Sequence, residues 1–317
     1  MEKLDRRKFL KKTVSVTAGL VLGNTFNYEA IAEPKSLVVQ VRSKRWRRSK
    51  GKVNAGIIKR MIDEGMMRLT GKRTPEAAWR SLFSPKEVVG IKFNRISRDF
   101  TGANQALVDA IVSGLTSVGI PRRNIIVVEA IGVKFNGGRP KGGWAKRVDF
   151  GSGKTRLSNF IVNQVDALIN VPNIKQHPLA GFTGALKNIS HAGGTIMEGP
   201  SRFHGNSCDP YIADIYAVKE IREKIRLHIS NGLKGIFDRG AEPPPPQFQW
   251  FLNSIFFSFD PVALDTIGAE LVDRARSQHR REKLRRDPRA LKYLRTAAKQ
   301  GLGVNDPRRI ALVKLTV

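Results

Sequence analysis

Residues 175–194 read KQHPLAGFTGALKNISHAGG and gather side chains that bind anions and move protons. Lysine holds carboxylates and phosphates, and histidine takes up or releases a proton near neutral pH. We therefore expect His177 to be an acid or base, and Lys175 and Lys187 to hold a small anionic substrate. His177 and Lys187 are the catalytic candidates.

The sequence FTGALKN predicts the start of a helix within this segment. Thr183 is the expected N-cap, and Gly184 would let a ligand approach the backbone. Free amides at a helix start bind anions, so we expect the backbone around Thr183 and Gly184 to help hold the substrate. The alternative is an ordinary capped helix with a solvated lysine.

Four side chains in and after this segment offer a metal-handling alternative: His177, His191, His204 and Cys208. Their spacing matches no standard zinc pattern, so no metal ligand is assigned. Cys208 is the only cysteine, which excludes an internal disulfide and a four-cysteine iron–sulfur cluster. The sequence specifies no cofactor.

The segment GSGKT at residues 151–155 is similar to part of a phosphate-binding loop. That motif requires a glycine five residues before its second glycine, and Val148 stands there instead. Nucleoside triphosphate hydrolysis is therefore excluded.

Short β-branched runs alternate with amphipathic helical patterns, which predicts an α/β fold with a mostly parallel central sheet and helices on both faces. The expected strands are residues 36–41, 87–94, 124–130, 165–172, 224–230, 254–260 and 309–315. The expected helices are residues 53–70, 75–83, 104–119, 210–221, 261–275 and 276–299. The Gly-, Lys- and Arg-rich residues 132–156 are expected to form a loop.

Ligands of such sheets bind beyond the carboxyl ends of the strands. Lys92 and Asn94 end one predicted strand, and the segment that begins at Lys175 follows another. We therefore expect Lys92, His177 and Lys187 to converge within about 10 Å, as the groups of one site must.

Residues 1–32 have the order of an export signal: the basic stretch DRRKFLKK, a short apolar stretch, and AIA. Arg6 and Arg7 followed by FLK resemble a twin-arginine translocation signal. This resemblance implies the twin-arginine translocase as a partner and a periplasmic or otherwise exported protein. No later apolar run approaches the roughly 20 residues of a membrane span.

The chain carries 56 Lys and Arg against 27 Asp and Glu, a net charge of +29. Residues 1–32 hold six bases and three acids, so their removal leaves +26. Such a surface attracts anions, and a non-catalytic binder of anionic envelope polymer or lipid is therefore an alternative function. No recognition motif accompanies the bases, which argues against a dedicated nucleic-acid reader.

Several segments resemble the family catalogued as domain of unknown function 362. They are VGIKFN at 89–94, KQHPLAGFTGALKN at 175–188, CDPYIADI at 208–215, DPVALDTIGAEL at 260–271 and the stretch 293–313. The resemblance implies one α/β domain over residues 33–317, and it implies no general activity. Some members carry a ferredoxin-like module whose cysteines this chain lacks. The shared site implied by the resemblance consists of Lys92, Asn94, Lys175, His177, Thr183, Lys187, Asn188, Asp209 and Asp265, the last with a structural alternative.

Overall fold

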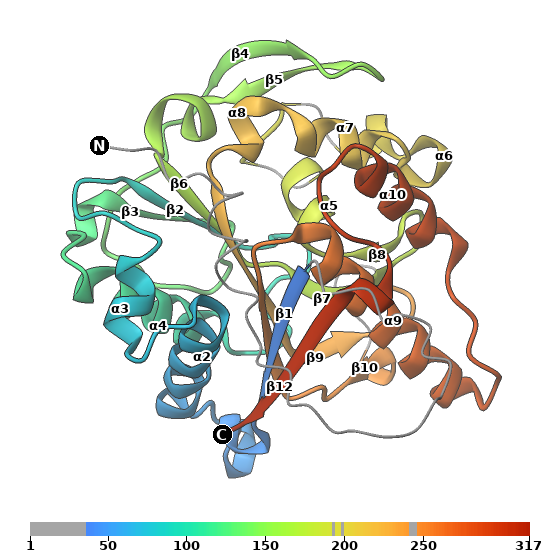
Figure 1. Cartoon of the computed structure of the whole chain (residues 1–317), viewed down its shortest axis with the longest axis horizontal. Helices are drawn as coiled ribbons and strands as arrows, with labels where there is room; N and C mark the ends of the chain where they lie inside the picture. Colours follow the sequence, from blue (N-terminus) through green and yellow to red (C-terminus); the bar gives the residue numbers. More distant parts are fainter. Residues whose placement is uncertain (1–35, 192–193, 198–199, 241–245) are drawn as a thin grey trace, which may run out of the picture.

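A computed structural model describes residues 36–191, 194–197, 200–240 and 246–317. The predicted signal at residues 1–32 lies outside the described residues. One ten-stranded sheet runs through the centre of the molecule (Figure 1). Its main order is β12 (Ile310–Thr316), β1 (Ser36–Arg42), β11 (Ser254–Ser258), β9 (Ile225–Ile236), β6 (Ala167–Asn170), β2 (Val89–Lys92) and β3 (Ile125–Val128).

Most of this sheet is parallel. The pairs β9–β6, β6–β2, β2–β3 and β12–β1 are parallel, and β11 is antiparallel to both of its neighbours. β10 (Gln249–Trp250) and β7 (Asn173–His177) extend β9, and β8 (Gly181–Thr183) pairs with β7. The structure thus confirms a mixed α/β fold with a large, mostly parallel central sheet.

The described part contains nine helices: α2 (Ala55–Thr70), α3 (Pro75–Arg80), α4 (Asn104–Ser117), α5 (Ala185–Ser190), α6 (Gly205–Cys208), α7 (Tyr211–Ala217), α8 (Lys219–Arg222), α9 (Pro261–Arg280) and α10 (Pro288–Lys299). Thr74 caps α3, because its side chain accepts the amide of Ala77. Short 3-10 helices lie at Lys44–Trp46, Ser49–Gly51, Arg122–Asn124, Pro200–Phe203, Pro246–Phe248 and Pro307–Arg309, and a short π-helix lies at Phe160–Gln164.

Alternate strand residues enter two separate hydrophobic cores, because successive side chains of a strand point to opposite faces. Ile169 of β6 belongs to the core that also contains buried residues of α2 and α4, whereas Leu168 belongs to the core with α5, α7 and α9. Gly65 allows α2 to approach the sheet closely, since a Cβ there would lie 2.1 Å from the Phe257 ring.

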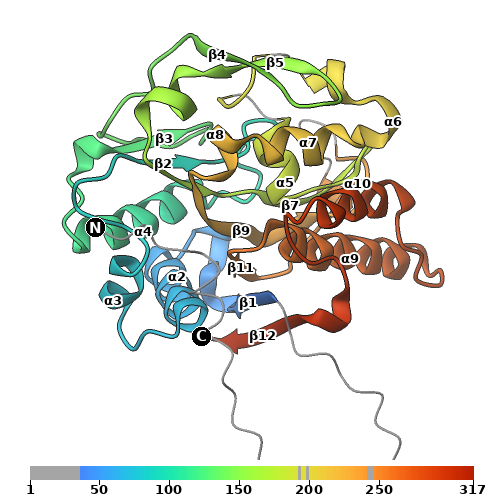
Figure 2. The same cartoon turned by 45° about the horizontal axis from the view of Figure 1, so that its top comes forward.

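Two sequence predictions about local structure are wrong. The expected loop at 132–156 contains most of a separate antiparallel hairpin, β4 (Trp144–Asp149) and β5 (Lys154–Ser158), which lies beside α7 and α8 (Figure 2). The expected helix at 276–299 is broken. α9 runs to Arg280, and Asp287 caps a new helix that starts at Pro288. In the described residues no helix is long and apolar enough to cross a membrane.

Candidate functional site

The hairpin β7–β8 presents three polar side chains of the predicted site on one face. Lys175 lies opposite Thr183 and His177 lies opposite Gly181, so Lys175, His177 and Thr183 share that face. Lys175 is 2% exposed and Thr183 is 4% exposed. Phe182 points from the other face toward Gly184 and Gly268 of α9. The hairpin was not predicted from sequence, although β6 was.

The His177 ring is fixed by its own turn. Its Nδ1 accepts the backbone amides of Leu179 and Ala180, both at 3.1 Å, so the proton of the neutral ring is on Nε2. Burial, together with the charges of Lys187 and Lys175, holds the pKa of His177 far below its usual value. His177 is therefore neutral at physiological pH and offers Nε2 to a ligand.

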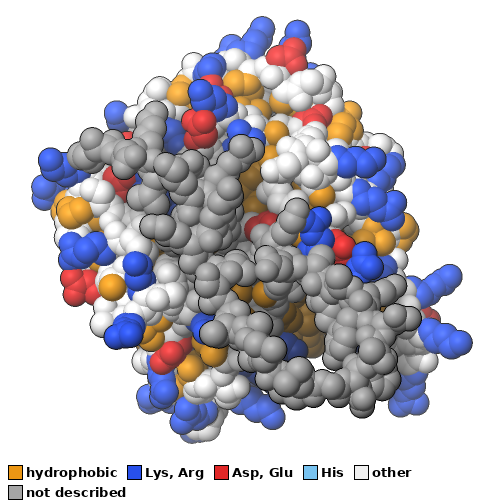
Figure 3. All heavy atoms as spheres, in the orientation of Figure 1, with side chains coloured by type: hydrophobic (Ala, Val, Ile, Leu, Met, Phe, Trp, Pro, Cys, Tyr) orange, Lys and Arg blue, Asp and Glu red, His pale blue; other side chains and the backbone are white. Residues whose placement is uncertain are grey.

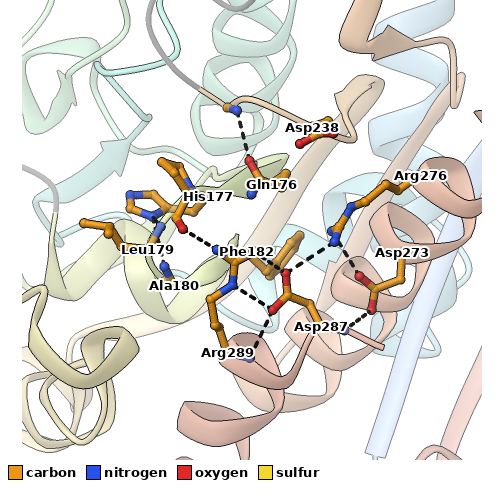
Figure 4. Close-up of polar contacts among 12 residues, drawn as sticks. Gln176, His177, Leu179, Ala180, Phe182, Asp238, Asp273, Arg276, Asp287 and Arg289 are labelled. Atoms are coloured by element: carbon orange, nitrogen blue, oxygen red, sulfur yellow. Dashed lines mark hydrogen bonds and ion pairs between the residues drawn. The ribbon is translucent and has the colours of Figure 1, made fainter. Parts of the chain in front are cut away.

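The start of α10 holds the turn that carries His177 (Figure 4). The Arg289 guanidinium donates to the carbonyl of Pro178 and also pairs with the carboxylate of Asp287. Gly181 has a φ of +77°, and a Cβ there would lie 2.8 Å from the amide nitrogen of Ala290. Arg289 and Gly181 thus fix the position of the His177 ring.

Asp265 of α9 caps α5. Its carboxylate accepts the amide of Ala185 at 2.5 Å and that of Leu186 at 3.0 Å. The N-cap is Gly184, so the prediction that Thr183 caps the helix is wrong. Because Asp265 takes these two amides, they are not free to hold an anion. Burial raises the pKa of Asp265 to about 7 against the opposing effect of the two amides.

A chain of buried polar groups ties α5 to the sheet. Asn94 donates to Asn188 at 3.0 Å, and Asn188 donates to Asn170 of β6 at 2.7 Å. Asn170 contacts the His228 ring of β9 at 3.0 Å, and that ring contacts the Tyr216 hydroxyl at 3.1 Å. Because unpaired buried polar groups are costly, this network fixes the position of α5. Asn170 and His228 were not predicted as site residues, because each is a polar residue within a predicted strand.

Lys187 of α5 and His191, the C-cap of that helix, lie one turn apart, and both contact His204. Lys187 Nζ lies 3.1 Å from His204 Nε2. The His204 ring stacks on His177 with centroids 5.2 Å apart, and the His191 ring meets it edge-on at 5.3 Å. We call Lys175, His177, Lys187, His191 and His204 the basic cluster. His177 and His204 are half-buried, whereas Lys187 and His191 lie deeper, at 4% and 5% exposure.

Burial in and beside the cluster favours the neutral forms of Lys187 and Cys208. Burial, and to a lesser extent the charge of Lys175, lowers the pKa of Lys187 to about 8, against an opposing effect of Cys208. Burial raises the pKa of the Cys208 thiol, although Lys187 acts in the other direction. Cys208 is fully buried and therefore a protonated thiol at neutral pH, not a nucleophile.

A left-handed turn brings Cys208 to Lys187. Asn206, Ser207 and Cys208 have φ values of 51°, 63° and 64°. Left-handed backbone costs a residue with a side chain roughly 1–2 kcal/mol, so the surrounding packing must stabilise this turn. Asp209 follows it, and in the described structure its Oδ1 is buried without a hydrogen-bond partner.

Lys92 forms an ion pair of its own. Its Nζ lies 2.9 Å from Glu129 Oε2 and donates to the Phe93 carbonyl at 3.2 Å. Burial lowers the pKa of Lys92, and Glu129 opposes that shift. Lys92 is not among the charges that shift the pKa of His177. The link from this region to the cluster runs through Asn94 and Asn188, not through Lys92. Glu129 is a further residue that the sequence reasoning missed.

The ring nitrogens of the cluster are largely engaged. His191 Nε2 donates to the Phe203 carbonyl at 2.8 Å, and its Nδ1 accepts from Ser190 at 2.8 Å. His177 Nδ1 and His204 Nε2 are also engaged. Among the residues placed by the structure, no group of three His, Cys, Asp or Glu is arranged to hold a metal ion.

Comparisons with known proteins match part of the chain to a family model and give no activity. No curated protein matches the chain. The crystal structure of a protein from Thermotoga maritima is similar at 12% identity, with a TM-score of 0.36. The alignment covers 73% of this chain and only 60% of that protein, and this likeness carries no argument. Residues 127–270 match the family described as Domain of unknown function (DUF362). The region that carries the basic cluster thus matches the domain of unknown function 362 family.

Proposed function

We propose that the basic cluster binds a small anion and that the protein is an exported enzyme acting on such a substrate. One observation carries the proposal. Lys187 is 4% exposed and contacts His204, and no carboxylate oxygen of the described residues lies within ion-pair distance of it. A buried cation without a counter-charge is costly, and a bound anion supplies that charge.

The chemistry of the neighbours supports a defined role for each. Lys187 and Lys175 hold the anion, and the Thr183 hydroxyl donates to it. Thr183 Oγ1 is buried and has no hydrogen-bond partner within the described structure. His177 transfers a proton through Nε2, because its Nδ1 is held by the two turn amides.

Export through the twin-arginine route is part of the same proposal and rests on Arg6 and Arg7. A substrate outside the cytoplasm follows from it.

A binder of anionic polymer or lipid is the second candidate, favoured by the charge of +29. On the face drawn in Figure 3, Lys and Arg side chains are spread around the surface and do not form one patch. A groove of about 700 Å³ between β4–β5 and α7–α8 has Lys146 and Arg147 in its lining, but also Asp149, Asp214 and Glu220. This mixture of charges favours the small anion over the polymer.

Calorimetric titration of the full chain with phosphate, sulfate and a dicarboxylate tests the proposal. We expect one site per chain for at least one of these anions, weakened about tenfold or more by Lys187→Met, because a charge-assisted contact is worth roughly 1.5–3 kcal/mol. Lys59→Met is the matched control, since Lys59 is exposed and pairs with Asp63 on α2. If the wild type, Lys187→Met and Lys59→Met all bind the anions equally, weakly and with strong salt dependence, the result would instead favour a binder of anionic polymer or lipid.

A further inference from the structure

Lys187 has the surroundings of a reactive amine. It projects from α5, which Asp265 caps and the Asn188–Asn170 contact ties to the sheet. Its Nζ lies 3.1 Å from His204 Nε2, so a proton can pass between the two nitrogens. The ring of His204 is held in turn by stacking on His177. The amine is thus fixed in place and has a proton acceptor within contact distance.

Two features keep this amine nucleophilic. It is 96% buried by side chains that exclude water, and a second cation, Lys175, acts on it from the facing hairpin. Desolvation and a neighbouring cation are the means by which proteins activate lysine for addition to carbonyl groups. The nearby thiol does not compete, because Cys208 is fully buried and protonated.

We propose that Lys187 forms an imine with its substrate and that the site takes a small oxo acid, a carbonyl compound that also carries a carboxylate. The inference rests on the proposed anion site and adds the substrate class. The carboxylate meets Lys175 and the buried Thr183 hydroxyl, which share one face of the hairpin. The carbonyl carbon then faces Lys187.

The step balances without a cofactor or an oxidant. The neutral Lys187 amine attacks the carbonyl carbon, a C–N bond forms, and the π electrons of the carbonyl move to oxygen. Both protons of the amine end on this oxygen, relayed by His204 Nε2, and the oxygen leaves as water. A C=N double bond remains between Lys187 and the substrate carbon.

Reductive trapping tests the imine. The full chain is incubated with pyruvate and sodium cyanoborohydride, and the adduct is mapped by peptide mass spectrometry. We expect near-stoichiometric labelling of Lys187, loss of that label in Lys187→Met, and at least a tenfold lower label at Lys234. Lys234 is the internal control, because burial lowers its pKa too, while its Nζ donates to the Phe100 carbonyl outside the cluster.

Parallel calorimetry with lactate, which has the carboxylate but no carbonyl, separates this inference from the proposed function. Lactate or phosphate binding at Lys187 without any trapped adduct overturns the imine and leaves the anion site intact. If neither anion binding nor a trapped adduct is found, both the imine and the proposed anion site are overturned. Labelling spread evenly over surface lysines also overturns the imine, and this readout needs only the wild-type protein.

Discussion

Replacing Lys187 by Met should make the unliganded protein more stable. The pKa of Lys187 is about 8 against an ordinary value of 10.5. At about 1.4 kcal/mol per pKa unit, burying the charged form costs about 3 kcal/mol at pH 7. Met keeps the length of the side chain and removes this cost, but it also removes the contact with His204, worth about 1–1.5 kcal/mol. The expected net gain is about 2 kcal/mol.

The gain should depend on pH in a defined direction. Below pH 8 the lysine is charged in both the folded and the unfolded chain, and the full cost is present. Between pH 8 and 10.5 the unfolded chain binds more protons, so wild-type stability rises relative to the variant, and the advantage of Met disappears. Urea unfolding at pH 7 and at pH 10.5, with Lys59→Met as control, measures the difference. A Lys187→Met protein that is less stable than wild type at pH 7, or whose stability difference from wild type does not change with pH, would contradict a buried charge at Lys187.

Four further predictions concern the supports of the site and the export route. Burial raises the pKa of Asp265 from 3.8 to about 7, so between these pH values the folded chain binds one more proton than the unfolded chain. As the pH rises from 4 to 7, the unfolding free energy of the wild type, measured with urea, should therefore fall by up to about 4 kcal/mol relative to Asp265→Asn. Arg289→Ala should weaken anion binding several-fold in calorimetry while the circular dichroism spectrum is unchanged, because the His177 turn loses its contact with α10 and no helix is altered. Asn170→Leu should cost about 3 kcal/mol of unfolding free energy, since it leaves three buried partners unsatisfied: Ala185, Asn188 and His228. Lysines in place of Arg6 and Arg7 should abolish export in a cell fractionation assay, and wild-type levels outside the cytoplasm would contradict the twin-arginine prediction.

Local chemistry made much of the fold predictable. Thr74 before Pro75 and Asp260 before Pro261 fix helix starts through their own side chains, and the structure confirms both starts. The β-branched runs VVQV in β1 and IIVV in β3 predict strands without any knowledge of the strands that pair with them. These signals act within a few residues, so the sequence alone reveals them.

Contacts across long stretches of chain were not predictable in this way. Asp265 reaches the start of α5 from 80 residues further along the chain, and this contact replaced the expected Thr183 cap. Five of the six β4 residues are exposed, so the strand lacks the apolar alternation that marks a half-buried strand. The hairpin β7–β8 is held by Arg289, more than a hundred residues away.

The position of a bound anion in a crystal structure is the sharpest test of the anion site at Lys187. Crystals grown with selenate would reveal the anion by anomalous scattering. We predict a selenate ion within hydrogen-bond distance of Lys187 Nζ, on the side of the β7–β8 hairpin that carries Lys175 and Thr183. Selenate bound only to surface arginines, with the Lys187–His204 contact unchanged and the cluster closed to the ion, would contradict it.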